Sequence, residues 1–212
     1  MLPEHWTCAY HEAEDGDEGL IEQIIATRPA LVAVSALTAS VLDAYRFADR
    51  LRGRRVPIVF GGLHATVCTD EARQHFDSVV VGEGEAVWPE LLDDAQRGEL
   101  KPVYRAAENG KSKSWPMPRY DLLGKNPPRF TIQTQRGCPL ACEFCGGSRL
   151  LGKFHEKPLE NIRAELAAIC GISRSPLIEL ADDNTFAGSR DADELLAAFK
   201  DSRARWFTEA DW

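Results

Sequence analysis

Short apolar runs alternate with amphipathic stretches along the first hundred residues of the chain. The runs that are short enough for buried strands cover residues 31–34, 56–60 and 78–81. Stretches with apolar residues at helical spacing cover residues 41–51 and 85–97, and a further helix is predicted over residues 70–75. Strands that alternate with helices in this way form a parallel sheet with helices on both faces. We therefore predict an α/β fold, with a doubly wound parallel sheet over residues 1–104.

A polar segment with four prolines separates this pattern from a second one. Residues 105–128 have no periodic apolar pattern and are predicted to form a linker. Beyond the linker, the predicted strands cover residues 130–134, 177–181 and 205–208. The predicted helices cover residues 158–169 and 192–199. Residues 129–212 are therefore predicted to be a second strand–helix region.

The acidic balance of the chain excludes one large class of function. The chain has 33 Asp and Glu against 25 Lys and Arg, which is a formal net charge of -8. A general nucleic-acid binder needs a basic surface that neutralises phosphates, so no nucleic-acid partner is expected. No run approaches the roughly 20 apolar residues of a membrane span, and residues 1–17 lack a signal-peptide pattern. We expect a cytoplasmic protein without a membrane span.

Three of the six cysteines crowd into one short segment, as Cys138, Cys142 and Cys145. A reducing compartment keeps thiols free, so clustered cysteines there indicate metal ligands rather than disulfides. The C-x3-C-x2-C spacing can hold three irons of a [4Fe-4S] cluster and leaves the fourth iron open. A zinc site with His155 as fourth ligand is the alternative, although zinc sites usually pair two C-x2-C units. A role as small buried hydrophobic residues, without a partner at metal spacing, is predicted for Cys8, Cys68 and Cys170.

The cysteine segment and the residues after the next predicted strand carry a family resemblance. Phe144 precedes the third cysteine, and Asp182-Asp183-Asn184-Thr185-Phe186 follows the strand at 177–181. These features resemble the cobalamin-binding branch of the radical S-adenosylmethionine (SAM) superfamily. The resemblance implies a Rossmann-like, cobalamin-binding-like domain, followed by the first part of a TIM-like β/α barrel over residues 129–212. It also implies that SAM chelates the open iron, with contacts from Phe144, Gly146, Gly147, Asp182 and Asp183. For the Asp-Asp-Asn run, a helix N-cap and turn is the alternative interpretation.

Glycine-rich segments in the first half extend the resemblance. Ser35-Ala36-Leu37, Gly61-Gly62-Leu63-His64 and Gly82-Glu83-Gly84-Glu85 are similar to segments that surround cobalamin in that branch. By this resemblance, cobalamin would be lined by Ser35, Leu37, Thr38, Gly61, Gly62, His64, Gly82 and Glu83. The branch's Asp-x-His-x-x-Gly segment, whose His binds cobalt, does not occur here, and its expected place lies upstream of Met1. Ordinary strand-end turns, and a partly buried, hydrogen-bonded His64, are the alternative interpretations.

The resemblance also implies an activity. A radical SAM enzyme cleaves SAM reductively to a 5'-deoxyadenosyl radical, and methyl transfer is the expected cobalamin-dependent reaction. Its partners would be a small-molecule substrate and an electron donor such as flavodoxin or ferredoxin. A full barrel takes about 250 residues, whereas only residues 130–212 remain here, so a non-catalytic cluster- or cobalamin-binding fragment or subunit is one alternative. A zinc-stabilised interaction module is another. An open half-barrel exposes sheet edges, so association that covers them is expected.

Overall fold

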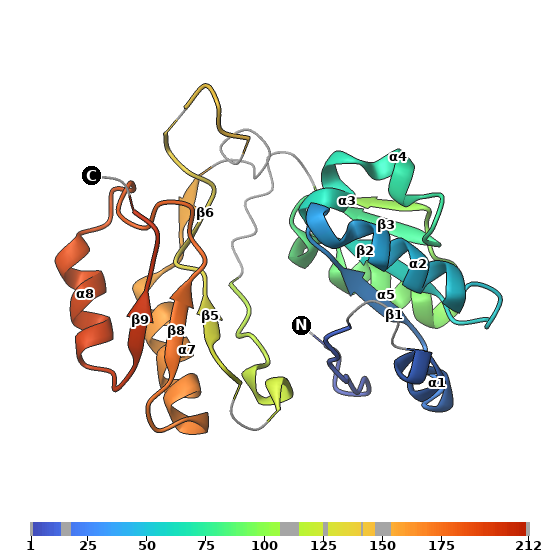
Figure 1. The fold of residues 1–212 in the computed structure, drawn as a ribbon, viewed down its shortest axis with the longest axis horizontal. Coiled ribbons are helices and arrows are strands. Elements are labelled where there is room, and N and C mark those ends of the chain that lie inside the picture. The colour runs from blue at the N-terminus through green and yellow to red at the C-terminus, as the bar shows by residue number, and fades with distance from the viewer. Residues whose placement is uncertain are drawn as a thin grey trace. The chain divides into compact units, whose positions relative to one another are not determined.

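The computed structural model describes residues 2–13, 18–106, 115–124, 127–140, 142–146 and 154–210. The chain forms two compact units, Met1–Ser112 and Lys113–Trp212 (Figure 1). Their boundary lies inside the 105–128 segment that the sequence assigned to a linker. Within the described residues, no helix is both long and apolar enough to cross a membrane.

A four-stranded parallel sheet forms the centre of the first unit. Its strands, in spatial order, are β1 (Val32–Ser35), β2 (Ile58–Gly61), β3 (Ser78–Val81) and β4 (Val103–Arg105). The first three were predicted from their apolar runs. Strand β4 was not, because three residues are too few to show a period.

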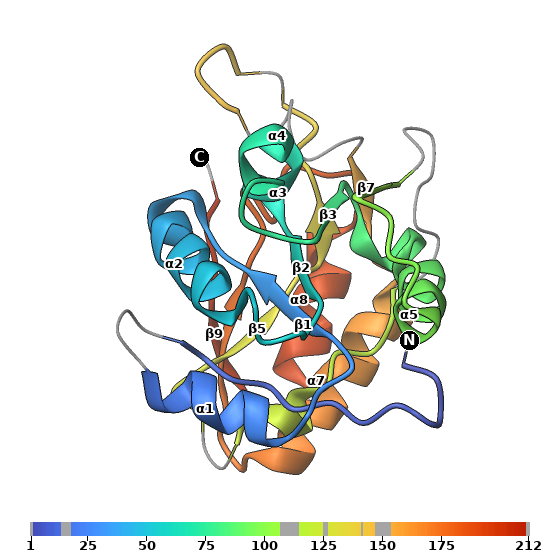
Figure 2. The same cartoon turned by 90° about the vertical axis from the view of Figure 1, so that its right-hand side faces the viewer.

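Helices cover both faces of this sheet, as the continuous apolar strands require. The helical elements are α1 (Glu18–Ala26), η1 (Thr38–Ser40), α2 (Val41–Leu51), α3 (Leu63–Val67), α4 (Thr69–Ala72), η2 (Gly84–Ala86) and α5 (Trp88–Arg97). Alternate residues of a strand point to opposite faces. Ile58 and Phe60 thus pack in the cluster that α2 covers, while Val59 packs in the cluster that α5 covers. Figure 2 shows α2 and α5 on opposite sides of the sheet. The parallel-sheet α/β prediction for this unit is confirmed.

The second unit has a smaller parallel sheet, ordered β5 (Phe130–Ile132), β8 (Leu177–Leu180) and β9 (Arg205–Phe207). Its helical elements are η3 (Tyr120–Leu123), α7 (Leu159–Ile172) and α8 (Ala192–Lys200). Ile132 and Ile178 are fully buried in one core cluster with residues of both α7 and α8. On the other face Thr131 is exposed and Glu179 half-buried.

A short antiparallel pair interrupts the strand–helix order. Strands β6 (Gln135–Arg136) and β7 (His155–Glu156) pair with Gln135 opposite Glu156 and Arg136 opposite His155. The sequence predicted one continuous strand over 130–134 that runs directly into the cysteine segment. Instead the chain leaves β5 at Ile132 and enters an antiparallel pair of strands, and the cysteines lie in the segment that connects them, which we call the cysteine hairpin.

We expect replacement of Phe60 by alanine to destabilise the first unit by about 3–5 kcal/mol, because a large cavity would open in its core. The ring is fully buried and stacks on Phe76 with ring centroids 4.5 Å apart. Urea unfolding followed by circular dichroism measures the change. The control is Leu42→Ala on α2, where the side chain is exposed, and its effect should stay within about 0.5 kcal/mol. Equal effects of the two substitutions would contradict this account of the core.

Candidate functional site

The carboxyl ends of β1 and β2 approach each other closely in the first unit. Ser35 and Gly61 are register partners at these ends. Gly62 follows with φ 101°, and a Cβ built on it would lie 3.0 Å from the Ser35 Oγ. A side chain at position 62 would therefore meet both backbone strain and the serine hydroxyl, so glycine is required.

Thr66, which the sequence analysis gave no role of its own, joins the glycine segments after β2 and β3. Its hydroxyl donates to the carbonyl oxygen of Gly62 (3.0 Å) and accepts from the N–H of Gly82 (3.0 Å). The sequence signal that could have indicated this role is a hydroxyl side chain four residues after Gly62, at the end of β2. This bridge holds the two turns side by side at one edge of the sheet.

Apolar side chains stand exposed along the same edge. Leu37, between β1 and α2, has 76% of its surface exposed, and Leu63 at the start of α3 has 39%. Thr38 begins η1 beside Leu37, and Glu83 is half-buried in the turn after β3. Exposed leucines beside close-packed glycine turns offer a surface to a large ligand that is partly apolar.

His64, a predicted cobalamin-lining residue, lies inside the unit with only 6% of its surface exposed. Its Nδ1 is 3.2 Å from the Thr38 Oγ1 and its Nε2 is 3.1 Å from the Tyr45 hydroxyl. Burial, together with the Glu71 carboxylate, raises the pKa of Tyr45 to about 12, so its phenol stays neutral. The placement of His64 matches the alternative interpretation of a buried, hydrogen-bonded histidine.

The β6–β7 hairpin presents the predicted cluster ligands in the second unit. Cys138, Cys142 and Cys145 are all half-buried free thiols. Gly137 turns the chain out of β6 with φ 69°, a conformation that favours glycine. Phe144 is 93% exposed. Gly146 is exposed as well, and Gly147 lies outside the described residues.

The spacing of these thiols bears on the zinc alternative. Tetrahedral zinc with Zn–S bonds of about 2.3 Å would bring its sulfurs to within about 3.8 Å of one another. Among the described residues, the loop thiols do not form a group of three ligand atoms within 4.8 Å of one another. In a [4Fe-4S] cluster each thiolate binds a different iron, so the sulfurs stand farther apart than they do around one zinc ion.

The other three cysteines differ from their prediction as buried hydrophobic residues. Cys8 is exposed, and Cys68 and Cys170 are only half-buried. Cys8 lies in an extended segment with no helix or strand, where no core forms around it. For Cys68 the helical geometry also supplies neighbours that sequence spacing did not suggest, His64 and Glu71.

Asp182, a predicted SAM contact, is a buried carboxylate with four hydrogen bonds from the protein. Its Oδ1 accepts the N–H groups of Thr134 (2.8 Å) and Gln135 (3.1 Å). Its Oδ2 accepts the hydroxyls of Thr134 (2.5 Å) and Thr185 (3.2 Å). A carboxylate satisfied in this way holds the end of β8 to the turn before β6 and has little capacity left for a ligand.

The neighbours of Asp182 are placed differently. Asp183 is exposed. Asn184 is 6% exposed, its backbone oxygen accepts from the Gln135 Nε2 (2.6 Å), and its side-chain Oδ1 has no hydrogen-bond partner among the described residues. A buried amide oxygen without a partner is costly unless a ligand donates to it. The sequence analysis named Asp182 and Asp183 as candidates but gave Asn184 no ligand role.

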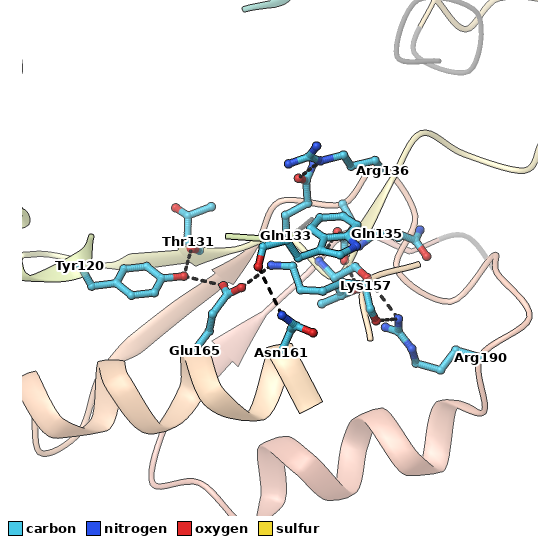
Figure 3. Close-up of polar contacts among 12 residues, drawn as sticks. Tyr120, Thr131, Gln133, Gln135, Arg136, Lys157, Asn161, Glu165 and Arg190 are labelled. Atoms are coloured by element: carbon cyan, nitrogen blue, oxygen red, sulfur yellow. Dashed lines mark hydrogen bonds and ion pairs between the residues drawn. The ribbon is translucent and has the colours of Figure 1, made fainter. Parts of the chain in front are cut away.

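A buried ion pair anchors the base of the cysteine hairpin. The Lys157 Nζ lies 2.6 Å from the Glu165 Oε1, with both side chains about 95% buried or more. Tyr120 donates from its hydroxyl to the Glu165 Oε2 (2.8 Å) and to the Thr131 carbonyl (3.1 Å). Burial and the Glu165 carboxylate raise the pKa of Tyr120, so it stays a neutral donor. Figure 3 shows these side chains converging between η3, β5 and α7.

Trp115 completes this anchor from the segment before η3. The Lys157 ammonium lies 4.9 Å and the Arg136 guanidinium 4.5 Å from its ring centroid. Arg190, from the loop before α8, donates to the Thr134 carbonyl (3.3 Å) and to the Lys157 carbonyl. Side-chain contacts therefore hold both strands at the base of the hairpin. Contacts of this kind orient the side chains that a loop offers to a ligand.

Comparison with known proteins identifies the first unit. Residues 1–92 match the family model described as the B12 binding domain. The chain therefore contains a B12-binding domain, in agreement with its parallel sheet and glycine-rich strand ends.

Several relatives are named as methyltransferases. The bacteriochlorophyllide d C-12(1)-methyltransferase of Chlorobaculum tepidum is 32% identical over 65% of this chain and 32% of its own length. The C-8(2)-methyltransferase of the same organism is 28% identical over 81% of this chain and 42% of its length. An uncharacterized methyltransferase of Pyrococcus horikoshii is 30% identical over 81% of this chain and 43% of its length. The chain thus spans about a third to two fifths of these relatives.

Two solved structures share the fold over most of the chain. The cobalamin-dependent SAM radical enzyme OxsB, solved with aqua-cobalamin, superposes with a TM-score of 0.62 at 18% identity. That match covers 84% of this chain and 29% of OxsB. The radical SAM methyltransferase TsrM from Kitasatospora setae gives a TM-score of 0.50 at 13% identity, over 92% of this chain and 59% of TsrM. At these identities the likeness is one of fold.

We expect Lys157→Met to destabilise the second unit by about 3–5 kcal/mol, because it leaves the Glu165 carboxylate buried without its cation. The double variant Lys157→Met with Glu165→Gln should recover at least half of that loss, since no buried charge remains. Urea unfolding measures both. The control is Arg129→Met, which breaks the ion pair between the exposed Arg129 and the half-buried Glu179 and should cost no more than about 1 kcal/mol. A double variant less stable than the single one would contradict the buried-charge explanation.

Proposed function

We propose that this chain is the cobalamin-binding and cluster-binding part of a radical SAM enzyme that transfers a methyl group. The observation that carries the proposal is the C-x3-C-x2-C hairpin at the carboxyl edge of a parallel sheet, in a chain that also contains a B12-binding domain. Ligand sites of α/β proteins are built at that edge. The methyltransferase names of the relatives support the reaction class.

Cys138, Cys142 and Cys145 would hold the [4Fe-4S] cluster in this proposal. When bound, such a cluster supplies the electron that cleaves the carbon–sulfur bond of SAM. Phe144, exposed between the second and third thiols, offers an apolar ring face on which an adenine could stack. An external one-electron donor such as flavodoxin or ferredoxin would reduce the cluster.

The polar contacts to SAM would come from Asp183 and Asn184 rather than from Asp182. The Asn184 Oδ1 is a buried acceptor that lacks a protein partner among the described residues, and the amino group of SAM is a suitable donor. The exposed Asp183 carboxylate is free of the four bonds that occupy Asp182 and could pair with the same cationic ligand. Asp182 then acts as a positioning residue.

Cobalamin would lie at the carboxyl edge of β1, β2 and β3. Ser35 supplies a hydroxyl there, Gly61, Gly62 and Gly82 supply a backbone that a ligand can approach, and Leu37 supplies apolar surface. Thr38 and Glu83 border the same turns. His64 would support this edge from inside through its bond to Thr38.

A second candidate function is to bind the cluster or cobalamin without catalysing a reaction. The chain spans 43% or less of the length of these relatives, and its second unit contributes three parallel strands to the proposed barrel. In that case the remaining strands and the small-molecule substrate site would come from elsewhere, and the open sheet would be covered by association.

Anaerobic reconstitution with iron and sulfide tests the cluster. The reduced chain should show an electron paramagnetic resonance signal of a [4Fe-4S] cluster that changes when SAM is added. The Cys142→Ser variant should lose it, whereas the control Cys170→Ser, a half-buried cysteine on α7, should keep it. A signal that ignores SAM would leave only the cofactor-holding function, and zinc in place of iron would contradict both proposals.

Binding of hydroxocobalamin tests the first unit. Gly62→Ala should weaken binding about tenfold, because its Cβ displaces the Ser35 hydroxyl and a lost hydrogen bond is worth about 1–1.5 kcal/mol. The matched control is Gly53→Ala, which also has positive φ but meets no atom within 4 Å. Equilibrium dialysis gives the affinities. Equal affinities of the two variants would place cobalamin away from this edge.

A further inference from the structure

A group of three potential metal ligands lies in the first unit, outside the proposed cluster site. The group consists of His64, Cys68 and Glu71, which we call the His64 triad. One ligand atom from each residue, an imidazole nitrogen, a thiol sulfur and a carboxylate oxygen, lies within 4.8 Å of the other two. Within the described residues this is the only such group of three.

The junction of two short helices explains why these residues meet. His64 lies on α3, Glu71 lies on α4, and Cys68 is the residue between the two helices. The N–H of Cys68 donates to the His64 carbonyl (2.8 Å) and its carbonyl accepts from the Ala72 N–H (3.0 Å), so His64 and Glu71 each lie about one turn from Cys68. The burial of the ligands is graded, with His64 buried, Cys68 half-buried and Glu71 exposed. A metal ion bound here would therefore be reached from solvent through the Glu71 side.

Hydrogen bonds on both ring nitrogens orient His64. Its Nδ1 is 3.2 Å from the Thr38 Oγ1, which can accept the Nδ1 proton. The Nε2 then carries the lone pair, which accepts from the Tyr45 hydroxyl at 3.1 Å, and it lies 4.0 Å from the Glu71 Oε1. A hydrogen bond on the far ring nitrogen is the usual way in which proteins fix the tautomer and the direction of a ligating histidine.

We propose that the His64 triad binds a zinc-type divalent metal ion through nitrogen, sulfur and oxygen. Three protein ligands of this mixture leave a fourth tetrahedral position for water. Metal–ligand bonds of about 2.0–2.3 Å require ligand atoms about 3.3–3.8 Å apart, so the triad must contract by roughly 1 Å. The exposed Glu71 side chain can make most of that movement. The Tyr45 hydroxyl, 3.1 Å from the His64 Nε2, turns to the metal-bound water or to Glu71.

This site would join α2, through Tyr45, to α3 and α4 on the face that carries Phe60 and Phe76. It uses none of the thiols assigned to the iron–sulfur cluster. Metal binding at the His64 triad is therefore independent of the proposed radical chemistry. An experiment can contradict one proposal and leave the other standing.

The test uses the full chain with Cys138, Cys142 and Cys145 replaced by serine, so that the hairpin cannot bind metal. Addition of Co²⁺ should produce a thiolate-to-cobalt charge-transfer band at one equivalent, which Zn²⁺ then removes. Saturating Zn²⁺ should also raise the melting temperature, because the ion binds the folded state alone. Cys68→Ser in this background should abolish the band, and Glu71→Gln should weaken Co²⁺ binding at least tenfold.

Two matched controls keep the test specific. Cys170→Ser removes a half-buried cysteine of the second unit, and Asp70→Asn removes an exposed carboxylate next to Glu71. Neither should change the band or the affinity. A band that survives Cys68→Ser would overturn the proposal. So would a folded parent chain, verified by circular dichroism, that shows neither the band nor a shift in melting temperature.

Discussion

The Asp182 carboxylate is the contact on which the candidate site of the second unit depends. A parallel sheet leaves backbone N–H groups without partners where its strands end, and these groups must be satisfied if they are buried. Asp182 accepts two such N–H groups, from Thr134 and Gln135, and two hydroxyls. Because Gln135 begins β6, the carboxylate also sets where the cysteine hairpin leaves the sheet. Without it, the end of β8 and the start of the hairpin would lose three of the hydrogen bonds that join them.

In the first unit, a neutral side chain rather than a carboxylate binds the backbone groups at the strand ends. There the Thr66 hydroxyl links the turns after β2 and β3, and the Gly62 backbone lies close to Ser35. The linking groups at this edge are a hydroxyl and glycines, with exposed leucines beside them. The second unit instead gathers carboxylates, an amide and thiols. The ligands that we propose for the two edges differ in the same way, since cobalamin is large and partly apolar, whereas SAM is cationic.

Buried charge gives the hairpin a fixed base at a cost in stability. Taking Lys157 and Glu165 out of water is unfavourable, and their mutual attraction offsets this only with good geometry and further hydrogen bonds. Tyr120 and the Trp115 ring supply those contacts. A fully satisfied polar network of this kind favours one arrangement of its members over others. Such an arrangement fixes the two short strands from which the cysteine segment extends.

The sequence by itself determined the order of the longer elements and the ligand types. Strands such as 78–81 and helices such as 41–51 follow from apolar periodicity, because burial of one face requires it. The turn after β2 and the candidate metal ligands could also be predicted, from the glycines and from the cysteine spacing. Few residue types tolerate positive φ, and few ligate metals.

Only the tertiary structure decided which polar groups are used up inside the protein and which remain open to a ligand. Strands β4, β6 and β7 are too short to show a period and form because a neighbouring strand or hairpin partner is present. The burial of His64, the four bonds to Asp182, the unpartnered Asn184 oxygen and the meeting of His64 with Cys68 all depend on packing. Hydrogen-bond satisfaction is a property of three-dimensional neighbours, and local sequence does not specify them.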